Sequence, residues 1–240
     1  MQSNKDVSVI LLAGGVGSRF GSEIPKQFLK LGHAPVALHS FQVFCSLNDI
    51  AEIAVVCAPE YQKLFPKYSS EGSIKFAPPG KRRQDSVYNG LHVFEKNTPF
   101  ICVHDSARPL ITEDVVRRVF AAAREHGAAT VGVPVKFTIK AVDASYFVQN
   151  TPDRTSIWEI QTPQVMRTEW LKEGFDYVNN NNITVTDDVS LVEQLNYPVK
   201  LVNGDSRNLK ITTTEDFTLL EKLLESAPQT SLNLMSPQDG

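Results

Sequence analysis

The chain has 240 residues, of which 42% are hydrophobic and 21% are charged, with 13 glycines and 14 prolines. This composition excludes a disordered chain, a collagen-like repeat and a disulfide scaffold. The length predicts one large domain with a well-buried core. The net charge of −3 leaves no basic excess to follow a polyanion, so we expect no nucleic-acid partner.

The two ends and the cysteines bear on where the protein works. Six residues precede the first apolar run, and no apolar stretch has the length of a membrane span, so we expect neither a signal peptide nor a membrane anchor. Cys45, Cys57 and Cys102 lie in apolar runs without the spacing of a metal or redox motif, which favours a reducing, cytoplasmic setting. Residues 227–240 are polar and are expected to be a disordered tail after a domain of residues 1–226.

Short apolar runs alternate with helical patterns through the first half of the chain. Thr112 can cap the start of one of these helices and Gly127 can end it. Alternating strands and helices predict a mostly parallel, Rossmann-like α/β sheet, whose ligands lie at the carboxyl ends of its strands. Strands are predicted at 7–12, 53–58, 74–77, 100–103 and 130–135, and helices at 39–47, 60–68, 85–94 and 113–126.

From Thr138 onward the pattern changes. Two short strands, at 138–142 and 146–150, precede an irregular segment and a strand at 157–161. We interpret residues 138–161 as a hairpin arm inserted into the domain. Because a two-stranded ribbon is marginal in water, the arm is expected to pack on a second copy of the chain; the alternative is an arm folded back on its own subunit. The α/β pattern then resumes with helices at 169–178 and 187–195, strands at 199–202 and 209–211, and a helix that begins at Thr214.

The first segment that indicates chemistry follows the strand at 7–12. It reads LLAGGVGSR over 11–19, and PKQF follows at 25–28. Glycines after a strand let backbone N–H groups approach phosphates. A dinucleotide fingerprint is excluded because position 20 is not glycine and no acid follows at the required distance, and a Walker loop is excluded because no Gly-Lys pair precedes Ser or Thr. A purely structural turn would account for the glycines but not for Arg19 and Lys26 beside them.

A second polar segment, GKRRQDS at 80–86, lies between a predicted strand and a helix. Cations beside a helix N-terminus favour an anion there. The alternative is a solvated charged turn, which is the better interpretation for Arg82 alone.

Two further segments add an acid and a lysine. Asp105 follows the strand predicted at 100–103, where an acid suits a divalent cation that bridges phosphates, although it could instead cap a turn. His104 is expected to be a structural hydrogen-bonding residue. Lys210 lies on the predicted strand at 209–211 and, taken alone, is typical of a surface lysine.

Together these segments resemble the nucleotidyltransferases that activate sugar and polyol phosphates. The motifs PKQF, RQDS at 83–86, HDSARP at 104–109, TPQ at 162–164, TDD at 186–188 and NLKIT at 208–212 narrow the resemblance to the 2-C-methyl-D-erythritol 4-phosphate cytidylyltransferase family. The resemblance implies a single-domain α/β nucleotidyltransferase fold with a protruding arm and a homodimer formed through that arm. It also implies Mg²⁺-dependent transfer of a cytidylyl group from CTP to methylerythritol phosphate, with release of pyrophosphate, in isoprenoid precursor synthesis.

The same resemblance implies a role for individual residues. Those expected to be catalytic are Arg19, Lys26 and Lys210. Those expected to bind CTP are Ala13, Gly14, Gly15, Gly80, Arg83, Ser86, Asp105 and Arg108, with Asp105 also holding the metal. Those expected to bind the acceptor phosphate are Thr138, Arg154 and Thr186, with Arg154 reaching the site of the partner subunit.

Two departures from the family pattern keep alternatives open. Phe137 stands before Thr138 where many members carry Asp, and Asp188 ends a triplet that usually reads Thr-Asp-Glu. Both changes touch the acceptor side, so a ribitol 5-phosphate cytidylyltransferase is the main alternative, although the segment at 151–159 favours the methylerythritol enzyme. A non-catalytic nucleotide-binding subunit is the second alternative, and the presence of Lys26, Asp105 and Lys210 disfavours it.

Overall fold

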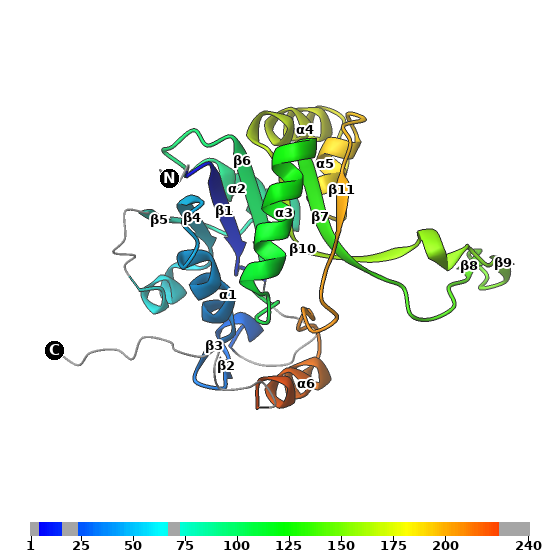
Figure 1. The fold of residues 1–240 in the computed structure, drawn as a ribbon, viewed down its shortest axis with the longest axis horizontal. Coiled ribbons are helices and arrows are strands. Elements are labelled where there is room, and N and C mark those ends of the chain that lie inside the picture. The colour runs from blue at the N-terminus through cyan, green and yellow to red at the C-terminus, as the bar shows by residue number, and fades with distance from the viewer. Residues whose placement is uncertain (1–4, 16–23, 67–72, 226–240) are drawn as a thin grey trace.

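The computed structural model describes residues 5–15, 24–66 and 73–225, and a seven-stranded sheet runs through its centre (Figure 1). The strand order is β11-β7-β10-β6-β1-β4-β5. Only β10 runs antiparallel to its neighbours in this sheet, so the expected mostly parallel α/β fold is confirmed. The strands are β1 (Val7–Leu12), β4 (Ile50–Val56), β5 (Ser73–Ala77), β6 (Phe100–Asp105), β7 (Ala128–Pro134), β10 (Trp158–Arg167) and β11 (Lys200–Asn203).

Helices cover both faces of the sheet. Along β1, Val9 and Leu11 belong to one apolar core and Ile10 to the other, because successive side chains of a strand point to opposite faces. This two-sided burial explains why the central strands are almost entirely apolar. One core contains α1 (Val36–Cys45) and α3 (Glu113–His126), and the other contains α2 (Arg83–Leu91), α4 (Thr168–Asn180) and α5 (Val189–Glu193).

A third apolar cluster lies beyond the carboxyl ends of the strands. Leu31, Ala107, Ile211 and Leu220 meet there and join α6 (Thr214–Glu225) to the rest of the domain. The cluster brings the segment after β1 and the segment after β11 to the same end of the sheet. The short elements nearby are the 3₁₀ helix η1 (Lys26–Phe28) and the strands β2 (Lys30–Leu31) and β3 (Ala34–Pro35).

The ends of α3 agree with the sequence prediction. Thr112 accepts a hydrogen bond at its Oγ1 from the backbone N–H of Val115, at 3.4 Å. Gly127 follows the helix with φ of +91°, a conformation that L side chains rarely adopt. A Cβ at this position would lie 2.2 Å from the ring of Trp170, so glycine is also required by packing against α4.

Three sequence predictions need correction. Residues 209–211 do not form a strand, because this segment crosses the carboxyl end of β6 and only the N–H of Ile211 bonds the turn there, to Ala107 O at 2.9 Å. The predicted helix at 60–68 is a 3₁₀ helix, η2 (Pro59–Leu64), and positions 67 and 68 lie outside the described residues. Strand β10 continues through Pro163 to Arg167, with an irregular register where the proline interrupts its pairing.

The hairpin arm is present and projects away from the α/β domain (Figure 1). Its strands, β8 (Ala141–Val142) and β9 (Val148–Asn150), are shorter than predicted and are followed by the 3₁₀ helix η3 (Arg154–Ser156). Phe137, Phe147 and Val148 are exposed by 78%, 73% and 58%. The arm of a single chain therefore leaves apolar surface uncovered. The expected tail at 227–240 lies outside the described residues, and none of the helices described is long and apolar enough to span a membrane.

Candidate active site

A cavity of about 460 Å³ opens at the carboxyl ends of β1, β5 and β6. Its volume is within the range of small-molecule sites. Its lining includes five cationic side chains and one acid, Asp105, so it suits an anionic ligand. The lining residues are Leu12, Gly14, Gly15, Lys26, Gln27, Gly80, Lys81, Arg82, Arg83, Ser86, Asp105, Ala107, Lys210 and Thr212.

Two glycines allow the loops on one side of this cavity to come close together. A Cβ on Gly14 would lie 2.4 Å from Pro79, and a Cβ on Gly80 would lie 2.3 Å from Asp85. The backbone N–H of Gly80 donates to Ser86 Oγ at 2.9 Å, which fixes the turn before α2. A side chain at Gly14 would force the two loops apart, and one at Gly80 would clash with the start of α2, which follows it. Gly14, Gly15 and Gly80 all line the cavity.

Arg82 caps the start of α2. Its backbone N–H donates to Asp85 Oδ2 at 3.0 Å, and its guanidinium pairs with the same carboxylate at 2.7 Å. Nearly half of its side chain is exposed, at 46%. Arg82 is thus a surface residue at the rim, as its sequence context indicates.

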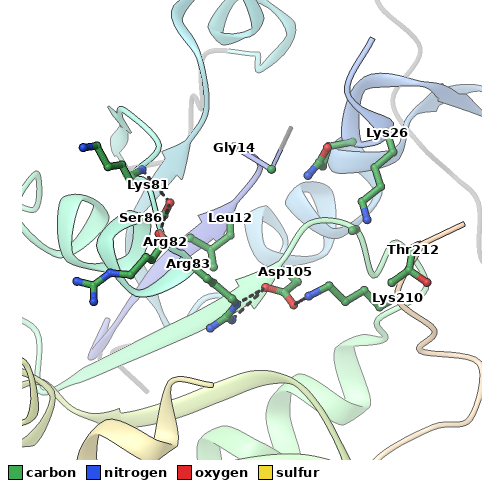
Figure 2. Close-up of a pocket in the computed structure, with 14 residues that line it drawn as sticks. Leu12, Gly14, Lys26, Lys81, Arg82, Arg83, Ser86, Asp105, Lys210 and Thr212 are labelled. Atoms are coloured by element: carbon green, nitrogen blue, oxygen red, sulfur yellow. Dashed lines mark hydrogen bonds and ion pairs between the residues drawn. The ribbon is translucent and has the colours of Figure 1, made fainter. Parts of the chain in front are cut away.

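Asp105, at the end of β6, is the centre of an ion-pair network (Figure 2). Lys210 Nζ lies 2.6 Å from its Oδ2, and Arg83 donates to its Oδ1 from Nε at 3.1 Å and from Nη2 at 3.0 Å. The other side of the Arg83 guanidinium meets Asp188, at 2.6 Å and 2.7 Å. One arginine therefore bridges two buried carboxylates, and a lysine approaches the first of them from the opposite side.

The charges in this network stabilise one another. Burial alone would raise the pKa of Asp105, but Arg83 and Lys210 outweigh it and hold that pKa well below its usual range. Burial alone would lower the pKa of Arg83, but Asp188 and Asp105 raise it above its ordinary value. Burial raises the pKa of Asp188, although Arg83 opposes this effect. Asp105 is therefore a carboxylate at neutral pH, and Arg83 is a cation.

Lys26 and Lys210 enter the cavity from different segments of the chain (Figure 2). Lys26 begins η1, and its ammonium group donates to the backbone O of Ile211, the residue after Lys210. The two lysines thus lie on the same side of the cavity, with Asp105 beside one of them. A polyanion bound there would meet two positive charges near each other.

His104 and Arg108 do not line the cavity. Burial lowers the pKa of His104 to about 4, so its ring is neutral at pH 7. Its Nδ1 lies 3.1 Å from Thr162 Oγ1 and its Nε2 lies 3.2 Å from Arg108 O, which supports the structural role expected for it. Arg108 donates from Nη1 to the backbone O of Asn208 at 2.7 Å, so its guanidinium holds a neighbouring loop.

The structure brings together eight of the residues that the sequence nominates, and these line the cavity: Gly14, Gly15, Lys26, Gly80, Arg83, Ser86, Asp105 and Lys210. The nominated residues that do not line it are Ala13, Arg108, Thr138, Arg154 and Thr186. Thr138 and Arg154 belong to the exposed arm, Thr186 lies exposed before α5, and Ala13 is buried with its N–H bonded to Val56 O. Arg19 lies outside the described residues.

Sequence reasoning missed two residues that support this site. Asp188 holds Arg83, and Gln164 accepts from the N–H groups of Asp188 and Val189 at 2.8 Å and 3.0 Å. Both belong to motifs that the sequence singled out, TDD and TPQ, but only Thr186 was given a role. The second acid of the TDD motif, Asp188, was the signal that the sequence offered. Only the structure shows that its partner is Arg83.

The residues present suit a metal that arrives with its ligand. No group of three or more His, Cys, Asp or Glu side chains that could hold a metal occurs within 5–15, 24–66 and 73–225. Among the described residues, Asp105 is the one carboxylate that lines the cavity. Mg²⁺ commonly binds one or two carboxylates together with substrate phosphates, and that donor set is compatible with Asp105.

Comparison with known proteins decides the family. The family model described as 2-C-methyl-D-erythritol 4-phosphate cytidylyltransferase matches residues 7–226. The chain belongs to the 2-C-methyl-D-erythritol 4-phosphate cytidylyltransferase family. The members of this cytidylyltransferase family are nucleotidyltransferases, so the resemblance drawn from the motifs is confirmed.

Relatives and solved structures in this cytidylyltransferase family cover most of the chain. The chloroplastic enzyme of Oryza sativa subsp. japonica is 49% identical over 227 residues, which are 92% of this chain and 75% of the rice protein. The enzyme of Chlamydia pneumoniae is 40% identical, covering 90% of this chain and 98% of its own. The crystal structure of 4-diphosphocytidyl-2C-methyl-D-erythritol synthase from Anaerococcus prevotii has a TM-score of 0.81 at 26% identity, covering 91% of this chain and 98% of that one. The structure of the Thermus thermophilus cytidylyltransferase has a TM-score of 0.75 at 32% identity, covering 92% and 99%.

Proposed function

We propose that the cavity at the carboxyl ends of β1, β5 and β6 carries out the reaction of the family, the transfer of a cytidylyl group from CTP to 2-C-methyl-D-erythritol 4-phosphate. An oxygen of the acceptor phosphate forms a bond to the α-phosphorus, the bond from that phosphorus to the bridging oxygen breaks, and pyrophosphate leaves. The observation that carries this assignment is the position of Asp105, flanked by Lys210 and Arg83 inside a cationic cavity. Residues 1–226 would form the catalytic domain.

The main task of such a site is to hold two anions together and to stabilise the charge that gathers on the α-phosphate. Gly14, Gly15 and Gly80 offer backbone close to the cavity, where no side chain keeps phosphates away. Lys26 and Lys210 supply positive charge from the opposite wall. No protein nucleophile is needed, because the acceptor phosphate attacks directly.

Asp105 would hold the divalent cation together with the phosphates of CTP. When bound, Mg²⁺ supplies charge neutralisation between phosphates that otherwise repel each other. Asp105 is suited to this task because it stays ionised at neutral pH. Asp188 keeps Arg83 beside the site from its other side.

The acceptor side would be completed by a second copy of the chain. Thr138 and Arg154 lie on the arm, outside the cavity of their own subunit, whereas Thr186 precedes α5. Two arms exchanged across a two-fold axis would cover the exposed Phe137, Phe147 and Val148. Arg154 would then offer its planar fork to the acceptor phosphate in the neighbouring subunit.

The setting proposed for this reaction is the cytoplasm. No disulfide joins the three cysteines, all of which lie in the described part of the chain, and Cys57 and Cys102 are buried. Burial raises the pKa of Cys57 to about 11, so this thiol stays protonated and resists oxidation. Buried, protonated thiols that form no disulfide support a reducing compartment.

Release of pyrophosphate tests the proposed reaction directly. We expect turnover with CTP and methylerythritol phosphate, dependence on Mg²⁺, and lower activity with UTP or ATP. Ribitol 5-phosphate serves as the matched acceptor control, because it differs in the polyol and keeps the phosphate. Undiminished activity in the presence of a chelator, or faster turnover of ribitol 5-phosphate, would contradict the assignment.

A further inference from the structure

We propose that Asn208 is a positioning residue that holds Lys210 opposite Asp105. The inference deepens the proposed function, on which it rests for the role of Lys210 in the reaction. It concerns a residue that does not line the cavity. Asn208 is fully buried, two positions before the lysine whose ammonium group enters the site.

The need for a positioning residue follows from the local backbone. Residues 208–212 are not part of the sheet, so strand pairing does not fix the direction of Lys210. On the far side of Lys210, the N–H of Ile211 donates to Ala107 O at 2.9 Å. On the near side, the anchor is Asn208. Because a lysine side chain is long and flexible, its ammonium group is held in place only if the backbone that carries it is fixed.

The amide of Asn208 ties this backbone to the residue that also holds Asp105. Its Nδ2 donates to Thr162 O at 2.9 Å and to Gln161 Oε1 at 3.2 Å. Thr162 Oγ1 in turn accepts the backbone N–H of Asp105 at 3.0 Å. The contact of 2.6 Å between Lys210 and Asp105 closes the ring. The separation of the lysine and the acid is therefore set through Thr162, on β10.

The main chain of Asn208 fixes a second element of the site. Its carbonyl oxygen accepts from Arg108 Nη1 at 2.7 Å. Arg108 N donates to Asp105 O at 2.9 Å, so both residues belong to one turn after β6. Asn208 thus joins the Lys210 loop to the Asp105 turn by its backbone and to β10 by its side chain.

Stability alone does not account for an asparagine at this position. Its Oδ1 is buried without a hydrogen-bond partner among the described residues. A buried acceptor without a donor costs free energy, which an aliphatic side chain of similar size would avoid. The two bonds that Nδ2 makes to β10 are what an aliphatic residue cannot provide.

The first test measures the position of Lys210 without substrates. Acetic anhydride labelling, followed by mass spectrometry, measures how fast each lysine is acetylated, and this rate falls when the ammonium group is paired with a neighbour. In Asn208→Ala we expect Lys210 to react about threefold faster or more, because its pairing with Asp105 becomes transient. Lys200, exposed on β11, is the internal reference. Asn203→Ala, at the end of the same strand, is the matched control and should leave both rates unchanged.

The second test measures coupling during turnover. Asn208→Ala should lower kcat about tenfold, with a smaller change in the KM for CTP, because the lysine acts mainly in the transition state. In a Lys210→Ala background the same change should cost less than about twofold, since residues that act through one another are not additive. A residue that only stabilised the fold would lower activity by the same factor in both backgrounds.

These outcomes separate the inference from the function on which it rests. Unchanged Lys210 reactivity in a folded Asn208→Ala protein, or independent effects in the double variant, would overturn the positioning role. Normal turnover by Lys210→Ala, together with faster Lys210 labelling in Asn208→Ala, would instead refute the assigned role of Lys210 and leave its positioning by Asn208 intact. If Asn208→Ala does not fold, Asn208→Leu replaces it, because the aliphatic side chain nearly keeps the volume and removes the donor without burying a charge.

Discussion

At the carboxyl ends of β5 and β6 the chain buries charged side chains, whereas on the arm it exposes apolar ones. Asp105 and Asp188 are 7% and 1% exposed, and Phe147 and Val148 are 73% and 58% exposed. Each arrangement is unfavourable by itself, because buried charges lose their hydration and exposed apolar groups keep theirs. In the cavity, Arg83 and Lys210 offset the cost within one chain. On the arm Phe147 stays exposed within the described chain, and we propose that a second copy of the chain covers it.

This contrast indicates that the two parts of the proposed active site, the nucleotide side and the acceptor side, are stabilised in different ways. The nucleotide side is assembled by the fold of a single subunit and is already ordered by its own ion pairs. In the proposed dimer the acceptor side would depend on association, because Arg154 lies on an element that stands away from its own domain (Figure 1). Substitutions should therefore act within one subunit in the cavity and across subunits on the arm.

The largest effect is expected from the two lysines of the cavity. Lys26→Ala or Lys210→Ala should each lower kcat about a hundredfold or more while changing KM much less, because each removes one preorganised charge at the α-phosphate. Steady-state kinetics with CTP and methylerythritol phosphate measure this, with Lys200→Ala as an exposed control. A folded Lys26→Ala protein with near-normal kcat would place the site elsewhere.

Mixed dimers test whether the arm works across subunits. Neither Lys26→Ala nor Arg154→Ala homodimers should be active, but a mixed dimer places both lesions in one composite site and leaves the other intact. Random mixing after co-refolding should restore about a quarter of wild-type activity, since half of the dimers are mixed and each has one working site. Pyrophosphate release measures the recovery. No gain in a preparation shown to contain mixed dimers would mean that Arg154 serves its own subunit or has no part in catalysis.

The buried histidine, His104, gives a smaller, pH-dependent effect. Burial lowers the pKa of His104 from 6.5 to about 4, so the unfolded chain binds a proton between these values that the folded chain does not. The contribution of His104 to the free energy of unfolding is therefore fully present above pH 6.5 and is lost as the pH falls toward 4. Between pH 7 and 5 the loss should be about 2 kcal/mol for this group. Urea unfolding of the wild type and of His104→Gln should differ in pH dependence by this amount, and parallel curves would show that the ring is not held neutral.

The smallest effect within a subunit is expected at the arm. Phe147→Ser replaces a side chain that is 73% exposed, so the unfolding free energy of the dilute, monomeric chain should change by no more than about 0.5 kcal/mol. The dimer should nevertheless dissociate at higher protein concentration than the wild type, because the partner arm loses apolar cover. Sedimentation velocity across a concentration series measures the difference. Equal association of both proteins would remove Phe147 from the interface.

Much of the fold was determined by local sequence signals. The apolar runs predict the central strands, and Thr112 and Gly127 predict both ends of α3, since caps and periodicity depend on neighbours in sequence. The motifs at the carboxyl ends of the strands also predict where the cavity lies, because parallel strands bring their ends to one edge. Lys26, Asp105 and Lys210 meet there although the sequence separates them widely.

Only the tertiary structure decided how those residues are held. Residues 209–211 have the pattern of a strand, yet they form a loop. The backbone they lie against is the turn after β6, where Ile211 N–H bonds Ala107 O, and not the edge of another strand. Arg83 pairs with Asp105, 22 residues away in the chain, and with Asp188, 105 residues away. Asn208 anchors the Lys210 loop to Thr162, 46 residues away. No local propensity encodes such contacts, since they arise when separate elements pack at one edge of the sheet and bury polar groups that must find partners there.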